Sequence, residues 1–301
     1  MYFIIGASSF IGKHLYDYCI KQNIGVVGTY YKHSYYKEWF RFNIYTDNLC
    51  DIVNNYSDTN DSHVIIICAA NTSIDDCKKN ESDSNQLNVI GIKRIVEQAD
   101  KMGMKCVFLS SEAVFDGRKG MYTEEDVPNP ITLYGKQKLL IEQYLAEYVN
   151  DYLVFRISRA VGSTYGEKDI FHEFYNKIIH NEAIVCLKDQ RFCLTEINDI
   201  VQGIVKGVGS EIRGLYNLSS DNYISRYELA QLYIKRIFGQ YENVVEKEYS
   251  DIPFLDNRHI FGGLRGGKLA GLLGIRYMGI DEILNKYKST YDKVQLEEGQ
   301  L

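Results

Sequence analysis

The stretch Tyr2-Phe-Ile-Ile-Gly6-Ala-Ser-Ser-Phe-Ile-Gly12 lies at the start of the chain. Its apolar run at residues 2–5 predicts a strand, and a helix is predicted from about residue 10 to residue 22. Gly6 and Gly12 let the backbone turn sharply and let the helix pack closely on the strand. Because free N–H groups at a helix start attract anions, the turn is typical of a dinucleotide-binding loop. A plain strand-to-helix connection is the alternative.

Ser9 occupies the middle position of this loop, where the Gly-x-x-Gly-x-x-Gly version has glycine. Its hydroxyl can donate to a phosphate, but serine disfavours a positive φ. After the next predicted strand, at 24–29, an NAD site usually has an acidic residue for the ribose. Here Tyr30-Tyr-Lys-His33 follows without an acid, and Lys32 with its neighbour can face a 2′-phosphate. We therefore expect NADP(H), with NAD as the alternative cofactor.

Short apolar runs alternate with amphipathic segments in the first half, which predicts βαβ units. Further strands are predicted at 64–70, 105–109 and 153–157, and further helices at 85–102 and 133–148. The run at 64–70 is apolar throughout, as in a strand buried on both faces. We expect an α/β fold with a Rossmann-type, doubly wound parallel sheet.

The pattern changes after about residue 160. Helical segments are predicted near 169–181, 197–208 and 225–238, with short strands such as 184–187 between them. They predict a smaller C-terminal α/β substrate domain packed on the first, because no Pro/Gly/Ser-rich linker intervenes. We expect the Rossmann domain at 1–160 and a mainly substrate-binding domain at 161–301, with segments at about 190–220 returning to the first. The polar end at 292–301 is expected to be frayed.

The composition narrows the class of partner. The chain has 301 residues and a net charge of −6, which argues against nucleic acid or an anionic membrane as the main partner. Its longest apolar run, 64–70, is far shorter than the roughly 20 residues of a membrane span. The N-terminus lacks the charged region of a signal peptide. The seven cysteines are odd in number and have no Cys-x-x-Cys spacing, and the histidines are scattered. We expect a cytoplasmic protein with reduced thiols and no metal.

Tyr134 and Lys138 are four residues apart in a predicted helix and so share one face. An ammonium beside a phenol favours the phenolate and lowers the pKa of the tyrosine, as a phenolic acid or base needs. A solvated helix face is the alternative for this pair taken alone.

Other segments of the chain, together with Tyr134 and Lys138, match motifs of a known protein family. They are Cys68-Ala69-Ala70, Leu87-Asn88-Val89-Ile90-Gly91, Leu109-Ser-Ser-Glu-Ala-Val-Phe-Asp-Gly117, Tyr122-Thr-Glu-Glu-Asp-Val-Pro-Asn-Pro130 and Arg156-Ile-Ser-Arg-Ala-Val-Gly162. Together they resemble the extended short-chain dehydrogenases/reductases, and most closely the dTDP-4-dehydrorhamnose reductase branch. The block at 109–138 is the specific part of this resemblance.

The resemblance implies roles for particular residues. The implied catalytic residues are Ser111, Tyr134 and Lys138. The implied cofactor contacts are Gly6, Ser8, Ser9, Phe10, Ile11, Gly12, Tyr30, Lys32, Asn43, Ile44, Ala69, Ala70, Asn88, Tyr134, Lys138 and Ile157. The implied substrate contacts are Asn71, Glu112, Ala113, Val114, Arg159 and Arg191.

The implied activity is NADP(H)-dependent reduction of a nucleotide-linked keto sugar, in deoxysugar or surface-polysaccharide biosynthesis, by a possible homodimer. Three residues depart from the branch: Ser9 in the loop, Ala113 where tyrosine is usual, and Arg159 where tryptophan is usual. Arg159 or Arg191 can pair with the substrate diphosphate, or form a surface salt bridge. The alternatives to a reductase are an epimerase or dehydratase on the same scaffold, and a regulatory binding protein like the β subunit of methionine adenosyltransferase.

Overall fold

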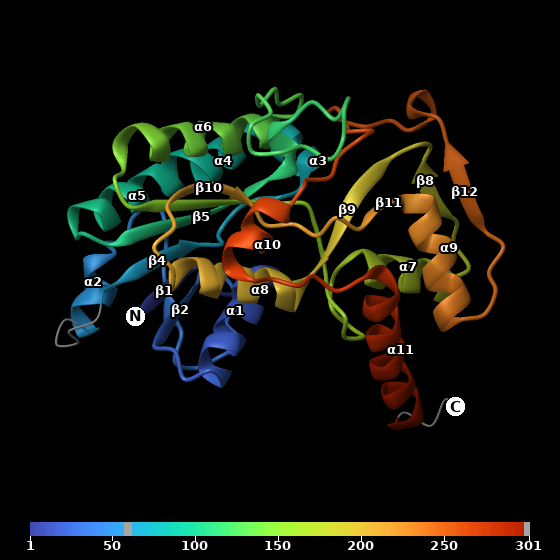
Figure 1. Cartoon of the computed structure of the whole chain (residues 1–301), viewed down its shortest axis with the longest axis horizontal. Coiled ribbons are helices and arrows are strands. Elements are labelled where there is room, and N and C mark those ends of the chain that lie inside the picture. Colours follow the sequence, from blue (N-terminus) through green and yellow to red (C-terminus); the bar gives the residue numbers. More distant parts are fainter. Residues whose placement is uncertain (57–61, 298–301) are drawn as a thin grey trace.

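A seven-stranded parallel sheet forms the centre of the molecule (Figure 1). The computed structural model describes residues 1–56 and 62–297. The strands are β1 Tyr2–Ile5, β2 Val26–Tyr30, β3 Phe40–Arg41, β4 Val64–Ile67, β5 Lys105–Ser111, β6 Tyr152–Ile157 and β10 Gly214–Asn217. Their order is β10-β6-β5-β4-β1-β2-β3, so the direction of winding reverses between β1 and β4. Sheets of this kind bind ligands at that reversal, beyond the carboxyl ends of the strands.

Helices cover both faces of the sheet. Figure 1 shows α5 (Ile92–Lys101) and α6 (Leu133–Tyr148) on one face, and α1 (Phe10–Lys21) with α8 (Ile197–Val208) on the other. Successive residues of β1 and β4 enter the two opposite cores in turn, which explains why these strands are apolar throughout. The predicted Rossmann-type α/β fold is confirmed.

A second group of elements lies beside the large sheet, at the right of Figure 1. Its strands form the sheets β11-β9-β7 and β12-β8, and α7, α9 and α11 enclose their apolar side. The bounds are β7 Arg159–Val161, α7 Ile170–Ile179, β8 Ile184–Leu187, β9 Arg191–Glu196, β11 Tyr223–Ser225, α9 Arg226–Ile237, β12 Val244–Lys247 and α11 Ile280–Glu297. This group has its own core, built around Phe171, Tyr233 and Tyr287.

The chain crosses between the two groups more than once. α8 and β10 belong to the large sheet, whereas β9 belongs to the smaller one. α10 (Gly267–Leu273) also packs on the large sheet through Leu269, which lies outside the predicted returning segment. The proposed domain limits therefore stay a prediction.

Several boundaries differ from the predicted ones. The strand expected at 64–70 ends at Ile67, and the one expected at 105–109 continues to Ser111. The helix expected at 85–102 begins at Glu81 as α4 (Glu81–Asn85) and passes through a π-helical turn at Gln86–Gly91. α11 extends to Glu297, so the expected fraying of 292–297 is wrong, and 298–301 lies outside the described residues. Gln295 is buried in this segment, and the burial of a polar residue by tertiary packing cannot be read from the sequence pattern.

The remaining short elements are α2 (Cys50–Val53), η1 (Asn54–Tyr56), α3 (Ile74–Lys79), η3 (Glu112–Val114) and η4 (Tyr249–Asp251). Among the helices of the described residues, none has the length and apolar character of a membrane span. All seven cysteines are free thiols, and the described residues contain no cluster of metal-ligating side chains.

Candidate active site

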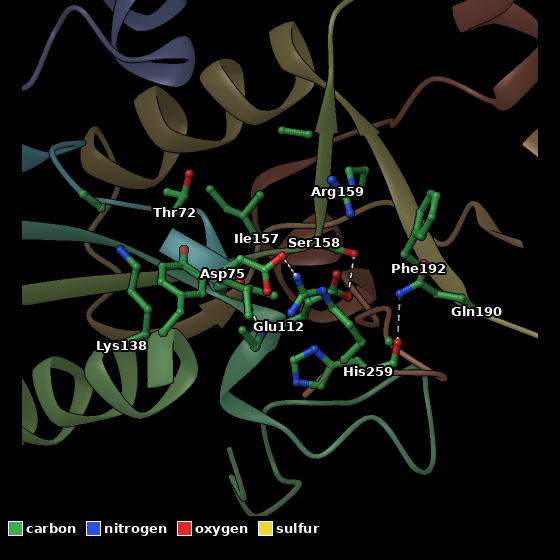
Figure 2. Close-up of a pocket in the computed structure, with 18 of the residues that line it drawn as sticks. Thr72, Asp75, Glu112, Lys138, Ile157, Ser158, Arg159, Gln190, Phe192 and His259 are labelled. Carbon is green, nitrogen blue, oxygen red and sulfur yellow. Dashed lines mark hydrogen bonds and ion pairs between the residues drawn. The ribbon is translucent and has the colours of Figure 1, made fainter. Parts of the chain in front are cut away.

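One cleft of about 890 Å³ runs from the start of α1, across the ends of β4, β5 and β6, to the smaller sheets. Figure 2 shows Lys138 at one end of this cleft, with Ile157, Ser158 and Arg159 following one another along its wall. Of the predicted residues, those that line the cleft are Ser9, Phe10, Ile11, Ala70, Ser111, Glu112, Ala113, Tyr134, Lys138, Ile157, Arg159 and Arg191. Residues predicted from distant parts of the sequence are thus brought together.

The loop before α1 is closely packed around its two glycines. Gly6 has φ +83°, and a Cβ there would lie 2.8 Å from the Cα of Ala69. A Cβ on Gly12 would lie 2.5 Å from the carbonyl oxygen of Gly6. Ser9 has φ −74° and caps the helix, because its Oγ accepts a hydrogen bond from the Gly12 N–H at 3.2 Å. The middle position therefore needs no positive φ, and serine fits it without strain.

Asn88 supports the cleft from behind. It is completely buried in the π-helical turn. Its Oδ1 accepts from the Asn71 N–H at 2.8 Å, and its Nδ2 donates to the Asn71 carbonyl at 2.9 Å and to Gln137 Oε1 at 2.8 Å. Asn88 thus ties the 69–71 segment to α6 and does not line the cleft. Asn71 and Ala69 also lie outside the lining, as does Val114, which is buried in a separate apolar cluster.

The residues predicted around the far end of the cofactor lie beyond the cleft. Tyr30 ends β2, Lys32 is exposed, and Ile44 is buried against Gly91. Arg94 holds the 43–47 loop by donating to the carbonyl oxygens of Ile44 at 3.2 Å and Asp47 at 2.6 Å. The structure adds a cation that sequence reasoning missed. Arg41 is paired with Tyr30 in the sheet and lies exposed beside the end of β2.

α6 begins at the place that brings Tyr134 to the cleft. Thr132 caps the helix by accepting from the Gly135 N–H at 3.0 Å, and Asp256 Oδ2 accepts from the Leu133 N–H at 2.7 Å. A Cβ on Gly135 would lie 2.0 Å from the carbonyl oxygen of Ala113. Glycine at 135 therefore lets the first turn of α6 lie directly against the segment after Ser111.

Tyr134 and Lys138 both face inward from this helix and are 8% and 3% exposed. Lys138 Nζ donates to the carbonyl oxygen of Leu109 at 2.8 Å and lies 5.7 Å from the centre of the Tyr134 ring. Ser111 ends β5, and its Oγ accepts from the Ala113 N–H at 3.2 Å. The burial of Tyr134 and Lys138 excludes the alternative that they lie on a solvated helix face.

The pKa of Tyr134 differs from the expected direction. Burial raises the pKa of this phenol, the Ser111 hydroxyl acts in the opposite direction, and the charges of Cys77 and Glu112 raise it further. Burial also lowers the pKa of Lys138 to about 8, partly opposed by Cys68 and Glu142. The expected lowering of the tyrosine pKa by the ammonium is thus wrong in this structure, because desolvation of the phenol is the largest effect.

A buried ion pair lies beneath these residues. Arg156 Nε and Nη2 donate to the two carboxylate oxygens of Glu142 at 3.0 and 2.6 Å, and Ser110 Oγ also donates to Glu142. Glu142 lies one helical turn after Lys138 on α6, and Arg156 lies on β6. The pair therefore joins the helix that carries Tyr134 and Lys138 to the sheet beneath it.

The opposite wall of the cleft is rich in charge. Glu112 Oε2 accepts from Ser158 Oγ at 2.7 Å and from the Gly263 N–H, and Figure 2 shows Glu112 with Ser158. Arg191 forms an ion pair with Glu228 at 3.1 Å, which agrees with the alternative that Arg191 makes a surface salt bridge. Two further lining arginines, Arg226 and Arg258, were not among the predicted site residues.

Comparison with known proteins identifies the family of this chain. Residues 1–272 match the family described as the RmlD substrate binding domain. The chain is 28% identical over 240 residues to methionine adenosyltransferase 2 subunit beta of Bos taurus, covering 75% of this chain and 69% of that protein. It is 26% identical over 238 residues to a dTDP-4-dehydrorhamnose reductase of Sinorhizobium fredii, covering 73% and 77%.

Solved structures show the same fold. A dTDP-4-dehydrorhamnose reductase of Clostridium acetobutylicum has a TM-score of 0.81 at 23% identity, covering 98% of this chain and 99% of that one. One from Bacillus anthracis, solved in complex with NADP, has a TM-score of 0.80 at 22% identity, covering 97% and 98%. The resemblance to the extended short-chain dehydrogenases/reductases is confirmed, and this chain belongs to the RmlD substrate binding domain family.

Proposed function

We propose that this protein is an NADP(H)-dependent reductase of a nucleotide-linked keto sugar. The observation that best supports the proposal is the meeting of Ser111, Tyr134 and Lys138 in one cleft with the helix start at Ser9. The smaller group of elements would hold the nucleotide part of the substrate. A role in deoxysugar or surface-polysaccharide biosynthesis belongs to the same proposal.

The residues present fit a dinucleotide. The crowded turn at Gly6 and Gly12 brings Phe10 and Ile11, at the start of α1, to the cleft, where their N–H groups would hold the pyrophosphate. Ile157 and Lys138 line the cleft where the nicotinamide end would lie. The dinucleotide, when bound, would supply the hydride for reduction of the keto carbon.

Proton transfer falls to the side chains of the protein. Tyr134 Oη would donate its proton to the keto oxygen, and the raised pKa of Tyr134 keeps the phenol protonated for that step. Ser111 Oγ would donate a hydrogen bond to the same oxygen, where negative charge develops. The Lys138 ammonium would stabilise the phenolate that remains.

The proposal is tested by incubating the purified protein with NADPH and a panel of 4-keto nucleotide sugars, and following absorbance of the reduced cofactor. We expect substrate-dependent oxidation of NADPH. Absence of both oxidoreductase and epimerase activity across the panel would contradict the enzymatic proposal.

A regulatory protein is the second candidate. It is supported by the 28% identity to methionine adenosyltransferase 2 subunit beta. Binding of NADPH without turnover of any keto sugar would favour it. The inward-facing Tyr134 and Lys138 favour the reductase, because a binding protein has no need of a buried proton donor beside an ammonium.

Substitution of Arg41 tests the proposed preference for NADPH over NADH. Arg41 lies exposed beside the end of β2, where we assign it to the 2′-phosphate of NADP(H). We expect Arg41→Ala to raise the KM for NADPH about 10-fold while the KM for NADH stays nearly constant, because the charged hydrogen bond to that phosphate is lost. Steady-state kinetics with both cofactors measures this. Arg213→Ala is the matched control, since Arg213 is exposed and pairs with Asp151 at 3.2 Å. An equal change in both KM values would contradict the assignment.

The pKa of Lys138 predicts the alkaline limb of activity. With a pKa lowered to about 8, Lys138 is charged below that pH and loses its proton above it. The rate is therefore expected to fall as pH rises through about 8, while Tyr134, whose pKa is raised, stays protonated. A profile of kcat against pH measures the limb. In Lys138→Arg the limb should disappear whatever activity remains, and a wild-type rate that stays constant well above pH 8 would refute the prediction.

A further inference from the structure

The cleft is locally positive in an acidic chain. The net charge is −6, yet the lining cations outnumber the lining carboxylates. The cations are Lys138, Arg159, Arg191, Arg226 and Arg258, and the carboxylates are Asp75, Glu112 and Glu173. Such a wall attracts anionic ligands.

Three of the four arginines are already neutralised by carboxylates of the protein. Arg258 pairs with Asp75 at 2.7 Å, and Arg226 with Glu173 at 2.5 Å. Arg191 pairs with Glu228 at 3.1 Å. These pairs fix the shape of the wall and leave little net charge for a ligand.

Arg159 is different. Within residues 1–56 and 62–297 its guanidinium makes no ion pair or hydrogen bond, and the side chain is exposed in the cleft. The nearby Glu112 carboxylate is held by Ser158 and the Gly263 N–H instead. The guanidinium lies 5.3 Å from the centre of the Phe192 ring. A cation–π contact of this kind uses none of the N–H donors of the guanidinium, so they stay available for a bidentate carboxylate.

The sheet register places Arg159 near the reacting end of the cleft. Ser111 at the end of β5 is the direct partner of Ile157 on β6, and Arg159 follows two residues later. Figure 2 shows Arg159 next to Ser158 on the wall that continues from Ile157. Arg159 pairs with Leu194, so Arg191 lies three residues away, about 10 Å along the strand. A substrate with its keto carbon at Tyr134 would therefore bring its sugar close to Arg159.

We propose that the substrate sugar carries a carboxylate, as a uronic acid does, and that Arg159 binds it. This inference rests on the proposed function, because it assumes that the keto carbon lies at Tyr134. It narrows the substrate from any keto sugar nucleotide to an acidic one. Arg159 thus acts as a specificity-determining residue, while Ser111, Tyr134 and Lys138 carry out the reaction.

The test compares two ligands that differ only at the proposed contact. Affinities of UDP-glucose and UDP-glucuronic acid, and of the same dTDP pair, are measured by calorimetry with the NADP⁺-loaded protein. We expect the acidic member of a pair to bind at least about 10-fold more tightly to wild type, the effect of one favourable ion pair. Arg159→Gln should remove this difference and leave the affinity for the neutral sugar within about 2-fold. Arg191→Ala is the matched control on the same wall and should preserve the difference.

Two outcomes would overturn the inference while sparing the proposed function. In one, wild type binds both members of a pair equally. In the other, Arg159→Gln weakens both members equally, which would place Arg159 on the diphosphate. Failure of wild type to bind any of the four sugar nucleotides would instead contradict the proposed function itself, and the inference would fall with it.

Discussion

Tyr134→Phe is expected to lower kcat by about 10³-fold, within the range that a positioned general acid contributes. The substitution removes one oxygen atom and keeps the ring, which is buried against Cys77 and Ala113. The fold and the cofactor site should therefore be preserved. Single-turnover oxidation of NADPH with an accepted keto sugar measures the chemical step, and fluorescence titration measures NADPH binding, which should change by less than about 2-fold.

Tyr148→Phe is the matched control, because Tyr148 ends the same helix with 59% of its surface exposed. It should have wild-type kcat. Substantial residual activity in Tyr134→Phe would show that another group protonates the substrate. Loss of NADPH binding in Tyr134→Phe would show that the phenol acts on the cofactor site.

Glu142→Ala is expected to lower the free energy of unfolding by about 3–5 kcal/mol, because it leaves the Arg156 guanidinium buried without its partner. Both side chains of this pair are 4% exposed, and Arg156 also lies over the Phe115 ring at 4.9 Å. Urea denaturation followed by circular dichroism measures the loss. Because Glu142 and Lys138 share α6, the variant should also lower activity.

The double variant Glu142→Leu/Arg156→Met separates charge from packing. It removes both charges, so most of the lost stability should return. Lys188→Ala is the matched control for a surface pair, because Lys188 and Glu248 are both half exposed or more, and it should cost less than about 1 kcal/mol. A Glu142→Ala variant as stable as this control would contradict the importance of the buried pair.

Sequence patterns predicted the central strands and helices because the determinants of those elements are local. The apolar run at 64–67 and the loop between Gly6 and Gly12 follow from residue type and spacing alone. The strands β3, β7, β9, β10, β11 and β12 were not among the predicted strands. Each is paired with a strand that is distant from it in sequence, and most of them have four residues or fewer, so their own sequence carries little signal.

The residues of the candidate site were likewise found partly from the sequence and partly only from the structure. Spacing and family resemblance brought forward Ser111, Tyr134 and Lys138 as site residues, but not Arg226 or Arg258. Arg226 begins α9 and Arg258 lies between η4 and α10, so both come to the cleft only in the folded chain. Asn88 was expected to touch the cofactor, and its complete burial assigns it to the support of Asn71.

The sequence by itself determined the Rossmann-type fold and placed Tyr134 and Lys138 on one face of a helix, because periodicity and glycine conformation are properties of neighbouring residues. Only the tertiary structure decided the direction of the Tyr134 pKa and the one lining arginine without a carboxylate partner among the described residues. The pKa of Tyr134 depends on its desolvation, and the pairing of an arginine depends on which carboxylates lie near it. Distant segments bring these groups together only when the chain folds.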